Sequence, residues 1–450
     1  MKPALIIAAL LGGTASAPAT VPGPSLAVPR PPATLSAAPD TIPMLTLGEA
    51  LQRATRLDPN YVRALGQIDN AEWGRRAARL AFIVPSLTAE LDATRYSTEF
   101  FNLGTGQPQA TAVNASVVAN YQIFSLKKFA DLRSSGADLE SAQASELQQR
   151  FRTAFLIESD YYGVLANQAL AMVASERLRR AEEQLAVARA RVVSGAAVQT
   201  DSLQLVLEVT RARIDLARQA AVLRVGQLQL GRRVGVTGPV GAAGADSIPP
   251  VELPVTLPYA VNEALRQGPQ YRAARANERS AEAALQARRS DYLPTLGLSL
   301  ANQTFDSRFF PTARNISSVS LAVTLPIWNL GQREIGATQA RVNRDVSRAI
   351  REDLERGALR DVTEAYEAYT TARRTVDLSQ LALAAATESF RVQEARYRSG
   401  ATTILELLDA QISLTQAQAD LVQANYATRL ALAGLEAILG RRLFPRGDVQ

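Results

Sequence analysis

The sequence predicts a mainly α-helical protein with a β-barrel contribution and a two-fold internal repeat. Three observations lead to this fold class. The same landmark residues occur twice in the same order, about 200 residues apart. Each half contains a proline-free segment of about 70 residues with helical periodicity. Each half also contains two segments in which apolar and polar residues alternate, which is typical of strands with two different faces.

The composition excludes several classes of function. Of the 450 residues, 47% are apolar and 6% aromatic, and the chain contains neither cysteine nor histidine. Thiol nucleophiles, disulfides, imidazole acid–base catalysis and Cys/His metal sites are therefore not available. The net charge is +6, but acidic and basic residues are interleaved, so we expect no nucleic-acid partner. We also expect no enzymatic activity, no cofactor and no metal site.

The N-terminal residues have the pattern of an export signal. Lys2 supplies a positive charge, Ala4–Leu11 is apolar, and Ala15–Ala17 gives a small-residue cleavage site. We therefore expect a signal peptide at 1–17, followed by a flexible Pro/Ala-rich segment at 18–43. No later stretch reaches about 18 consecutive apolar residues, so we expect no transmembrane helix.

The internal repeat defines the expected organisation of the chain. Pro59 and Tyr61 recur as Pro269 and Tyr271, and the Ser-Gly pair at 194–195 recurs at 399–400. We expect a first repeat at 44–234, a linker at 235–254, a second repeat at 255–443 and a tail at 444–450. Each repeat should contain a helix, two strands, a long helix, a tip and another helix.

The first helices should span 46–81 and 256–291, interrupted at their prolines. The strands follow: apolar residues alternate with small polar ones around 87–93, 113–121, 296–300 and 319–325. An ordinary half-exposed sheet and a membrane barrel both have this alternation. Runs of about 9–12 residues, the export signal and flanking aromatic residues favour the barrel. These aromatic residues are Phe82, Tyr96, Phe100, Phe101, Phe124, Tyr292, Phe305, Phe309, Phe310 and Trp328.

Four strands per chain cannot close a barrel, and open sheet edges are not tolerated in hydrocarbon. Several copies must therefore share one barrel, and the smallest plausible closed ring contains three copies. The membrane interpretation thus requires a homotrimer in contact with lipid.

The long segments 126–193 and 330–399 should each form one helix of roughly 100 Å if continuous. Apolar and small residues such as Leu139, Ala142, Leu178 and Leu185 recur at helical spacing with charged residues between them. This pattern indicates coiled-coil-like packing. An exported, soluble periplasmic coiled-coil scaffold or adaptor is the alternative interpretation.

Taken together, the repeat, the strand end Pro326–Gly331 and the tip Tyr397–Asp409 make the chain resemble the TolC-like outer-membrane efflux protein family. The resemblance extends from Thr46 to about Leu443. It implies a homotrimeric channel-tunnel, with a twelve-stranded barrel in the outer membrane and helices in the periplasm. Such proteins are exit ducts for tripartite drug or metal-ion efflux pumps or for type I secretion. They work with a periplasmic adaptor and an inner-membrane pump.

The resemblance places a channel gate at the tips. Glu406 and Asp409 match two acidic positions that surround the constriction, and Asp201 and Tyr397 match residues that hold the gate closed. Thr402 stands where well-studied members have arginine, so the corresponding ion pair with Asp201 is not expected here. Without the resemblance, the favoured interpretation of the two acids is that they are solvated residues that suit the start of a helix.

The tips also provide the expected docking surface for the adaptor. Gly400 suits a turn after a helix, and Thr402 or Thr403 suits an N-cap. The alternative is that these residues pack within one chain. The docking residues implied by the resemblance are Ser194, Gly195, Ala196, Ala197, Val198, Gly400, Ala401 and Ile404.

Overall fold

The computed structural model describes residues 42–102, 106–244, 250, 252–306 and 314–444. The expected signal peptide and nearly all of the flexible segment at 18–43 lie outside these ranges. So do Phe309, Phe310 and most of the C-terminal tail.

Each repeat begins with two short helices that meet at a proline, as predicted. In the first repeat, α1 (Leu47–Leu57) is followed by α2 (Pro59–Leu80), and in the second, α5 (Leu257–Gln267) is followed by α6 (Pro269–Arg289). Proline is accommodated at the first position of α2 and α6 because its missing N–H has no partner there in any helix. Asp58 caps α2 by accepting hydrogen bonds from two backbone N–H groups, at 3.0 and 2.9 Å.

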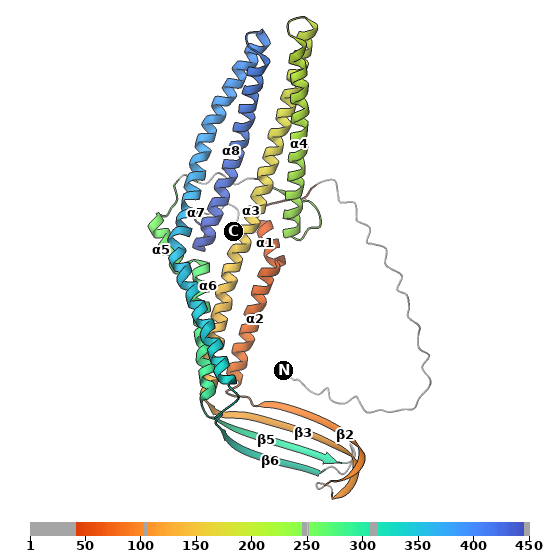
Figure 1. Cartoon of the computed structure of the whole chain (residues 1–450), viewed down its shortest axis with the longest axis vertical. Coiled ribbons are helices and arrows are strands. Elements are labelled where there is room, and N and C mark those ends of the chain that lie inside the picture. Colours follow the sequence, from red (N-terminus) through yellow and green to blue (C-terminus); the bar gives the residue numbers. More distant parts are fainter. Residues whose placement is uncertain (1–41, 103–105, 245–249, 251, 307–313, 445–450) are drawn as a thin grey trace, which may run out of the picture. The chain divides into compact units, whose positions relative to one another are not determined.

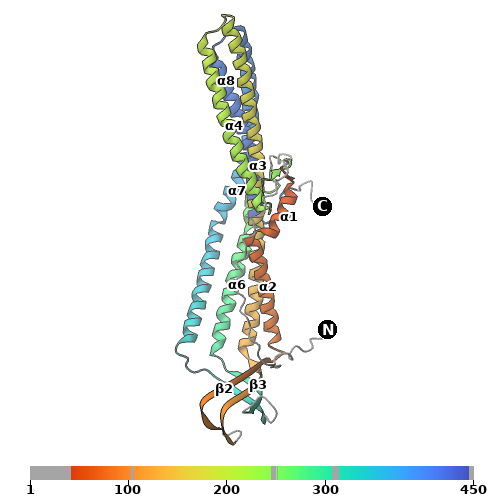
Figure 2. The ribbon, with the colours of Figure 1, turned by 90° about the vertical axis from the view of Figure 1, so that its right-hand side faces the viewer.

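Two helices of 68 residues, α3 (Leu126–Val193) and α7 (Gln332–Ser399), extend through most of each repeat. Each turns back into a shorter antiparallel partner, α4 (Gln199–Arg233) and α8 (Ile404–Leu439) (Figures 1 and 2). The absence of proline makes these lengths possible. Helix α7 starts two residues later than predicted, because Leu330 and Gly331 adopt left-handed φ values of 58° and 79°. Within the described ranges, no helix is both long enough and apolar enough to cross a membrane.

The four predicted strands form one antiparallel sheet in the order β2-β3-β5-β6. Strands β2 (Ser86–Asn102) and β3 (Gln107–Ser125) have 17 and 19 residues, longer than the predicted runs. The extension arises because pairing resumes beyond a register shift between Arg95 and Phe100, where the sequence no longer alternates. Strands β5 (Thr295–Asp306) and β6 (Arg314–Thr324) have 12 and 11 residues, the predicted length.

The register separates an apolar face of the sheet from a polar face. Leu87 pairs with Ala119, which pairs with Leu300, which pairs with Val319. The neighbouring row on the opposite face consists of Ser86, Asn120, Ser299 and Ser320. The apolar face is not covered by any described part of the chain, since Val319, Leu321 and Val323 are 65–73% exposed. The helices of the described chain lie to one end of the sheet (Figure 1).

The main cores lie among the helices, where each repeat packs its first short helix against its long helix. In the first repeat, Ala50 and Ala54 of α1 lie with Ile157 and Tyr161 of α3. In the second, Ala260 and Ala264 of α5 lie with Val362 and Tyr369 of α7. A small parallel sheet, β1 (Met44–Leu45) with β4 (Gly241–Ala242), joins the first core. The sequence does not predict strand β4 within the linker, because two residues are too few for an alternating pattern.

A buried ion cluster connects the end of the second repeat to the first. Arg442, which follows α8, donates hydrogen bonds to Glu436 at 2.7 Å and to Glu158 of α3. Glu158 and Glu436 are 1% and 3% exposed. Burial alone lowers the pKa of the Arg442 guanidinium, but its hydrogen bonds to the two carboxylates and their negative charge outweigh burial and raise it. Arg442 therefore stays protonated and ties the two repeats together.

Replacing Arg442 with methionine should lower stability by about 2–4 kcal/mol, because two buried carboxylates would lose their counter-ion while part of the site still reaches solvent. Thermal unfolding of the purified protein measures this change. The matched control is Arg391→Met, since Arg391 pairs with Glu388 on the exposed surface of α7. Its loss should have a much smaller effect on stability, because both partners remain solvated. Equal effects of the two substitutions would contradict the role of the buried cluster.

Candidate functional site at the helix tips

The two helix tips lie together at the end of the bundle that is farthest from the sheet (Figures 1 and 2). Residues 194–198 join α3 to α4, and residues 400–403 join α7 to α8. Gly195 and Gly400 adopt φ values of +76° and +83°, a region that glycine enters without strain. In both turns, the residue after glycine donates its N–H to the carbonyl five residues back, at 2.8 Å. The predicted turn chemistry is confirmed in both repeats.

An apolar cluster packs the two tips against each other. It contains Ala188 and Leu205 from the first repeat, and Phe390, Leu407 and Leu414 from the second. Tyr397 and Ile404 also belong to it, with 3% and 4% of their surfaces exposed. The prediction that Ile404 is exposed is therefore wrong. Ile404 lies on the same side of α8 as Leu407, three residues later, and that side faces the cluster.

The Tyr397 ring is buried in this cluster, and its hydroxyl has no hydrogen-bond partner. Burial raises the pKa of Tyr397, and the nearby Asp201 carboxylate raises it further, while Arg191 lowers it. Asp201, in the first turn of α4, thus acts on Tyr397 through space without a hydrogen bond to the hydroxyl. The structure thus brings two of the predicted gate residues near each other.

Glu406 and Asp409 are exposed on the side of α8 that faces away from the apolar cluster. Thr403 is the N-cap, with its side-chain oxygen accepting from the Glu406 N–H at 3.4 Å. Thr402, next to it, donates its hydroxyl hydrogen to the Glu406 carboxylate. Two adjacent threonines therefore hold Glu406 at the start of the helix. Thr402 acts within its own hairpin and does not contact Asp201.

Arg191 is the tip residue that our sequence reasoning missed. It lies in the last turn of α3, and its guanidinium carbon is 4.9 Å from the centre of the Tyr397 ring. It donates hydrogen bonds to the carbonyl of Tyr397 and, at 3.2 Å, to the carbonyl of Ala196. The repeat contained a signal for this residue, since Arg191 and Arg396 each stand four positions before a turn glycine.

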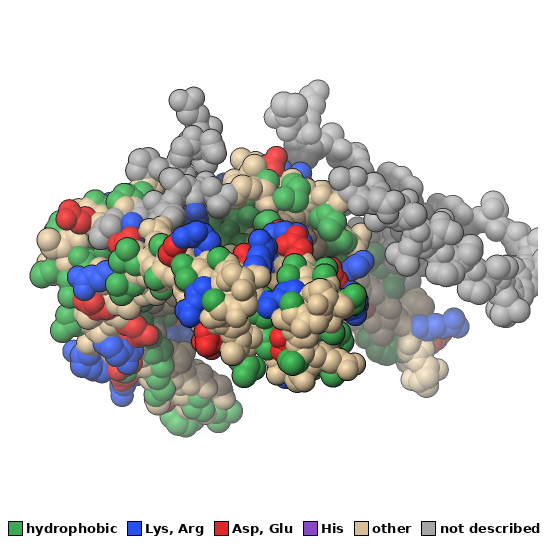
Figure 3. Space-filling model, turned by 90° about the horizontal axis from the view of Figure 1, so that it is seen from above, with side chains coloured by type: hydrophobic (Ala, Val, Ile, Leu, Met, Phe, Trp, Pro, Cys, Tyr) green, Lys and Arg blue, Asp and Glu red, His purple; other side chains and the backbone are tan. Residues whose placement is uncertain are grey.

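Seen from the tip end, basic and acidic side chains lie among apolar ones, without a field of one sign (Figure 3). The docking residues predicted in the turns are exposed, apart from the partly buried Ala197. Val198 is the largest apolar side chain among them and is 64% exposed. Val193 and Leu405, at the adjoining helix ends, are also exposed, so the tip surface offers small side chains together with several apolar ones.

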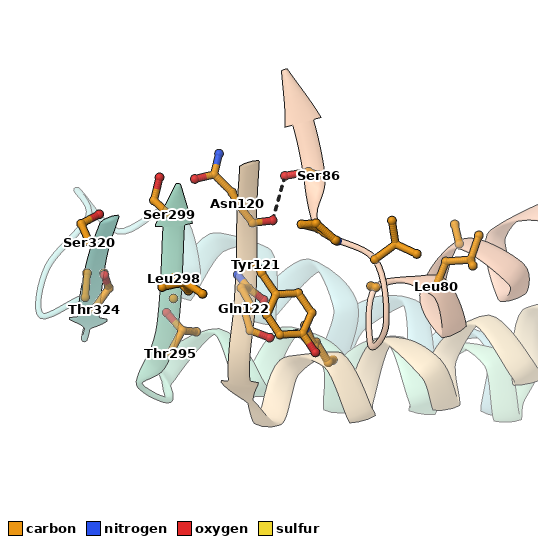
Figure 4. Close-up of a pocket in the computed structure, with 17 residues that line it drawn as sticks. Leu80, Ser86, Asn120, Tyr121, Gln122, Thr295, Leu298, Ser299, Ser320 and Thr324 are labelled. Atoms are coloured by element: carbon orange, nitrogen blue, oxygen red, sulfur yellow. Dashed lines mark hydrogen bonds between the residues drawn. The ribbon is translucent and has the colours of Figure 1, made fainter. Parts of the chain in front are cut away.

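Away from the tips, a hollow with a cavity volume of about 690 Å³ lies where the sheet meets the helices. Its lining includes the polar row of the sheet, in which the Ser86 hydroxyl donates to the Asn120 carbonyl at 3.2 Å (Figure 4). Lys128 of α3 also lines it. Hydroxyl and amide groups of this kind can hold water or polar solutes.

Comparison with known proteins identifies relatives along nearly the whole chain. The family model described as outer membrane efflux protein matches residues 50–235 and 260–441. The cation efflux system protein CusC of Escherichia coli (strain K12) is 25% identical over 352 residues, covering 75% of this chain and 74% of that protein. The cobalt-zinc-cadmium resistance protein CzcC of Cupriavidus metallidurans is 25% identical over 402 residues, covering 88% and 90%.

The fold is shared with solved structures. The crystal structure of a membrane protein from Pseudomonas aeruginosa superimposes with a TM-score of 0.72 at 20% sequence identity. The superposition covers 89% of this chain and 91% of that one.

Replacing Gly400 with alanine should disturb the tips more than the equivalent change at Gly195. Both substitutions strain a left-handed backbone, at a cost of about 1 kcal/mol each. Only at Gly400 would the new Cβ approach Arg191, with 3.3 Å to its Nη2, whereas nothing lies within 4 Å at Gly195. Thermal unfolding of the two variants compares them directly. A larger loss of thermal stability in Gly195→Ala than in Gly400→Ala would show that the space around Gly400 is unimportant.

Proposed function

Because the chain belongs to the outer membrane efflux protein family, we propose that it is the exit duct of a tripartite efflux system or of type I secretion. It conducts substrates passively across the periplasm and the outer membrane, with its helices in the periplasm. The observation that carries this proposal is the uncovered apolar face of the sheet in an outer-membrane protein.

Three copies of the chain share one closed barrel of twelve strands. In the described chain, β2 and β6 are the edge strands of the sheet and pair on one side only. An edge strand of this kind is tolerated in hydrocarbon only if another strand pairs with it. Edge β6 of one copy therefore pairs with β2 of the next, the apolar face contacts lipid, and the polar row faces the lumen.

The tips form the periplasmic gate, with the gate residues Asp201, Tyr397, Thr402, Glu406 and Asp409. In a trimer, Glu406 and Asp409 each occur three times and form two rings of carboxylates around the axis. Acidic rings attract cations and raise the barrier to anions. Support comes from the position of both acids on the exposed side of α8 and from the threonines that hold Glu406.

The same tips dock a periplasmic adaptor, which links the duct to an inner-membrane pump. The docking residues are Ser194, Gly195, Ala196, Ala197, Val198, Gly400 and Ala401. Ile404 is omitted because it is buried within the chain. Small side chains allow the backbone of a partner helix to approach closely. CusC, a relative in this family, is named as part of a cation efflux system, which supports a partner pump here as well.

The alternative of a soluble periplasmic scaffold is less well supported. Such a protein would leave the apolar side chains of four strands exposed to water, which is unfavourable because of the hydrophobic effect. A scaffold would also be released without detergent, whereas the duct requires it.

Replacing Leu321 with arginine should block insertion of the sheet into the membrane or assembly of the trimer. Replacing the adjacent Ser320 with arginine should be tolerated. The two residues are exposed on opposite faces of β6. A cationic side chain facing lipid costs about 2–4 kcal/mol near the bilayer centre, whereas one in the lumen remains hydrated. The amount of trimer in the outer-membrane fraction measures both. Equal tolerance would contradict the proposed orientation of the sheet.

Neutralising the gate acids together, as Glu406→Gln with Asp409→Asn, should reduce the preference of the channel for cations. Reversal potentials under a salt gradient, recorded from purified trimers in planar bilayers, measure this preference. The control Asp353→Asn with Glu388→Gln removes the same charge from exposed positions on α7. The acidic rings are rejected if selectivity stays unchanged, or if the control changes it as strongly.

A further inference from the structure

We infer that Arg191 is the positioning residue that holds the two helix tips of each chain together and keeps the gate acids at the constriction. This inference rests on the proposed role of the tips as a gate. It assigns the holding contact to a cation on the first hairpin. In well-studied members of the family, the arginine stands at the position that Thr402 occupies in this chain.

The contacts of Arg191 cross from one hairpin to the other. Its Nη1 donates to the carbonyl of Tyr397 in α7, and its Nη2 donates to the carbonyl of Ala196 in its own turn at 3.2 Å. The guanidinium also lies over the Tyr397 ring, 4.9 Å from its centre. One side chain thus makes three contacts, of which two reach the second repeat.

Each of these acceptors favours a cation. The carbonyl of Tyr397 is in the last turn of α7, at the electronegative end of that helix, and the carbonyl of Ala196 lies in the turn that follows α3. The face of the tyrosine ring adds a further negative potential. Arginine can satisfy two carbonyls and a ring at once because its guanidinium is a planar fork, whereas lysine is a single point charge.

The other predicted latch residues do not replace this contact. The Tyr397 hydroxyl has no hydrogen-bond partner, and Thr402 bonds to Glu406 within the same hairpin. In the described part of the chain, the next hydrogen bond between α3 and the second hairpin joins Arg180 to Gln418 at 3.2 Å, farther from the tips. Arg191 is therefore the polar connection closest to the gate acids.

The repeat supplies a matched control. Arg396 is equivalent to Arg191 and donates to the carbonyl of Ala401 in its own turn, at 3.5 Å. No hydrogen bond or ion pair of Arg396 with the first hairpin is found among the described residues. Replacing Arg396 thus removes a similar charge and a similar turn contact but leaves the connection between the tips intact.

The test compares Arg191→Gln, Arg191→Lys and Arg396→Gln in the full-length trimer. A second change, Ala410→Cys, adds a reporter in each background. Ala410 is 6% exposed in the tip cluster, and the chain has no other cysteine. The measurement is the rate at which a charged thiol reagent modifies this cysteine, together with closed-state conductance in planar bilayers.

In Arg191→Gln, we expect the modification rate to rise about tenfold, the population shift that corresponds to losing one charged hydrogen bond. Closed-state conductance should rise with it. Arg191→Lys should give an intermediate rate, and Arg396→Gln should give the same rate as the chain that carries Ala410→Cys alone. An unchanged rate in Arg191→Gln, or an equal rise in Arg396→Gln, would overturn the assignment.

The two readouts separate the inference from the proposed function. If the chain without any substitution forms no pore, the proposed function as a duct is rejected. The reactivity of the introduced cysteine still reports whether Arg191 holds the tips together. If Arg191→Gln does not fold, the comparison of Arg191→Lys with Arg396→Gln decides: a faster rate in the lysine variant supports the assignment, and equal rates reject it.

Discussion

The sheet imposes the constraint on which the rest of the structure depends. Its apolar face has no cover within the described chain, and its two edge strands pair on one side only. Strand β3 passes directly into α3 at Leu126, so the position of the sheet also determines where the longest helix of the first repeat begins. A barrel completed by neighbouring copies would therefore arrange the helices of those copies around the same axis. The location of the tips follows from this continuity and from the length of α3 and α7.

The two repeats share a backbone plan but differ in the side chains that matter most. Each has a proline-started second helix, a 68-residue helix and a glycine turn. At the tips, however, Arg191 reaches across to the other hairpin, whereas its equivalent Arg396 stays within its own turn. The Glu158–Arg442–Glu436 cluster is likewise formed once, between repeats. Duplication thus provides the scaffold, and these asymmetric contacts add to the β3–β5 pairing and the apolar tip cluster that also join its halves.

The sequence does not predict several features of the structure, and each of these misses has a physical cause. The alternating pattern underestimated β2 and β3, because backbone pairing continues where side chains no longer alternate. The position of Ile404 in a tip predicts that it is exposed, but the helical register turns it into a cluster to which both repeats contribute side chains. Arg191 was overlooked because its partners are backbone carbonyls, which every residue possesses and no motif records.

The sequence by itself determined the helices, their interruption at proline, the glycine turns and the two faces of the strands. These depend on periodicity and backbone preferences, which act over a few residues. Only the tertiary structure decided which side chains of one repeat meet those of the other, as in the contact of Arg191 with Tyr397 and of Arg442 with Glu158. Such pairs are separated by more than two hundred positions, and their distance is set by how long helices pack rather than by any local rule.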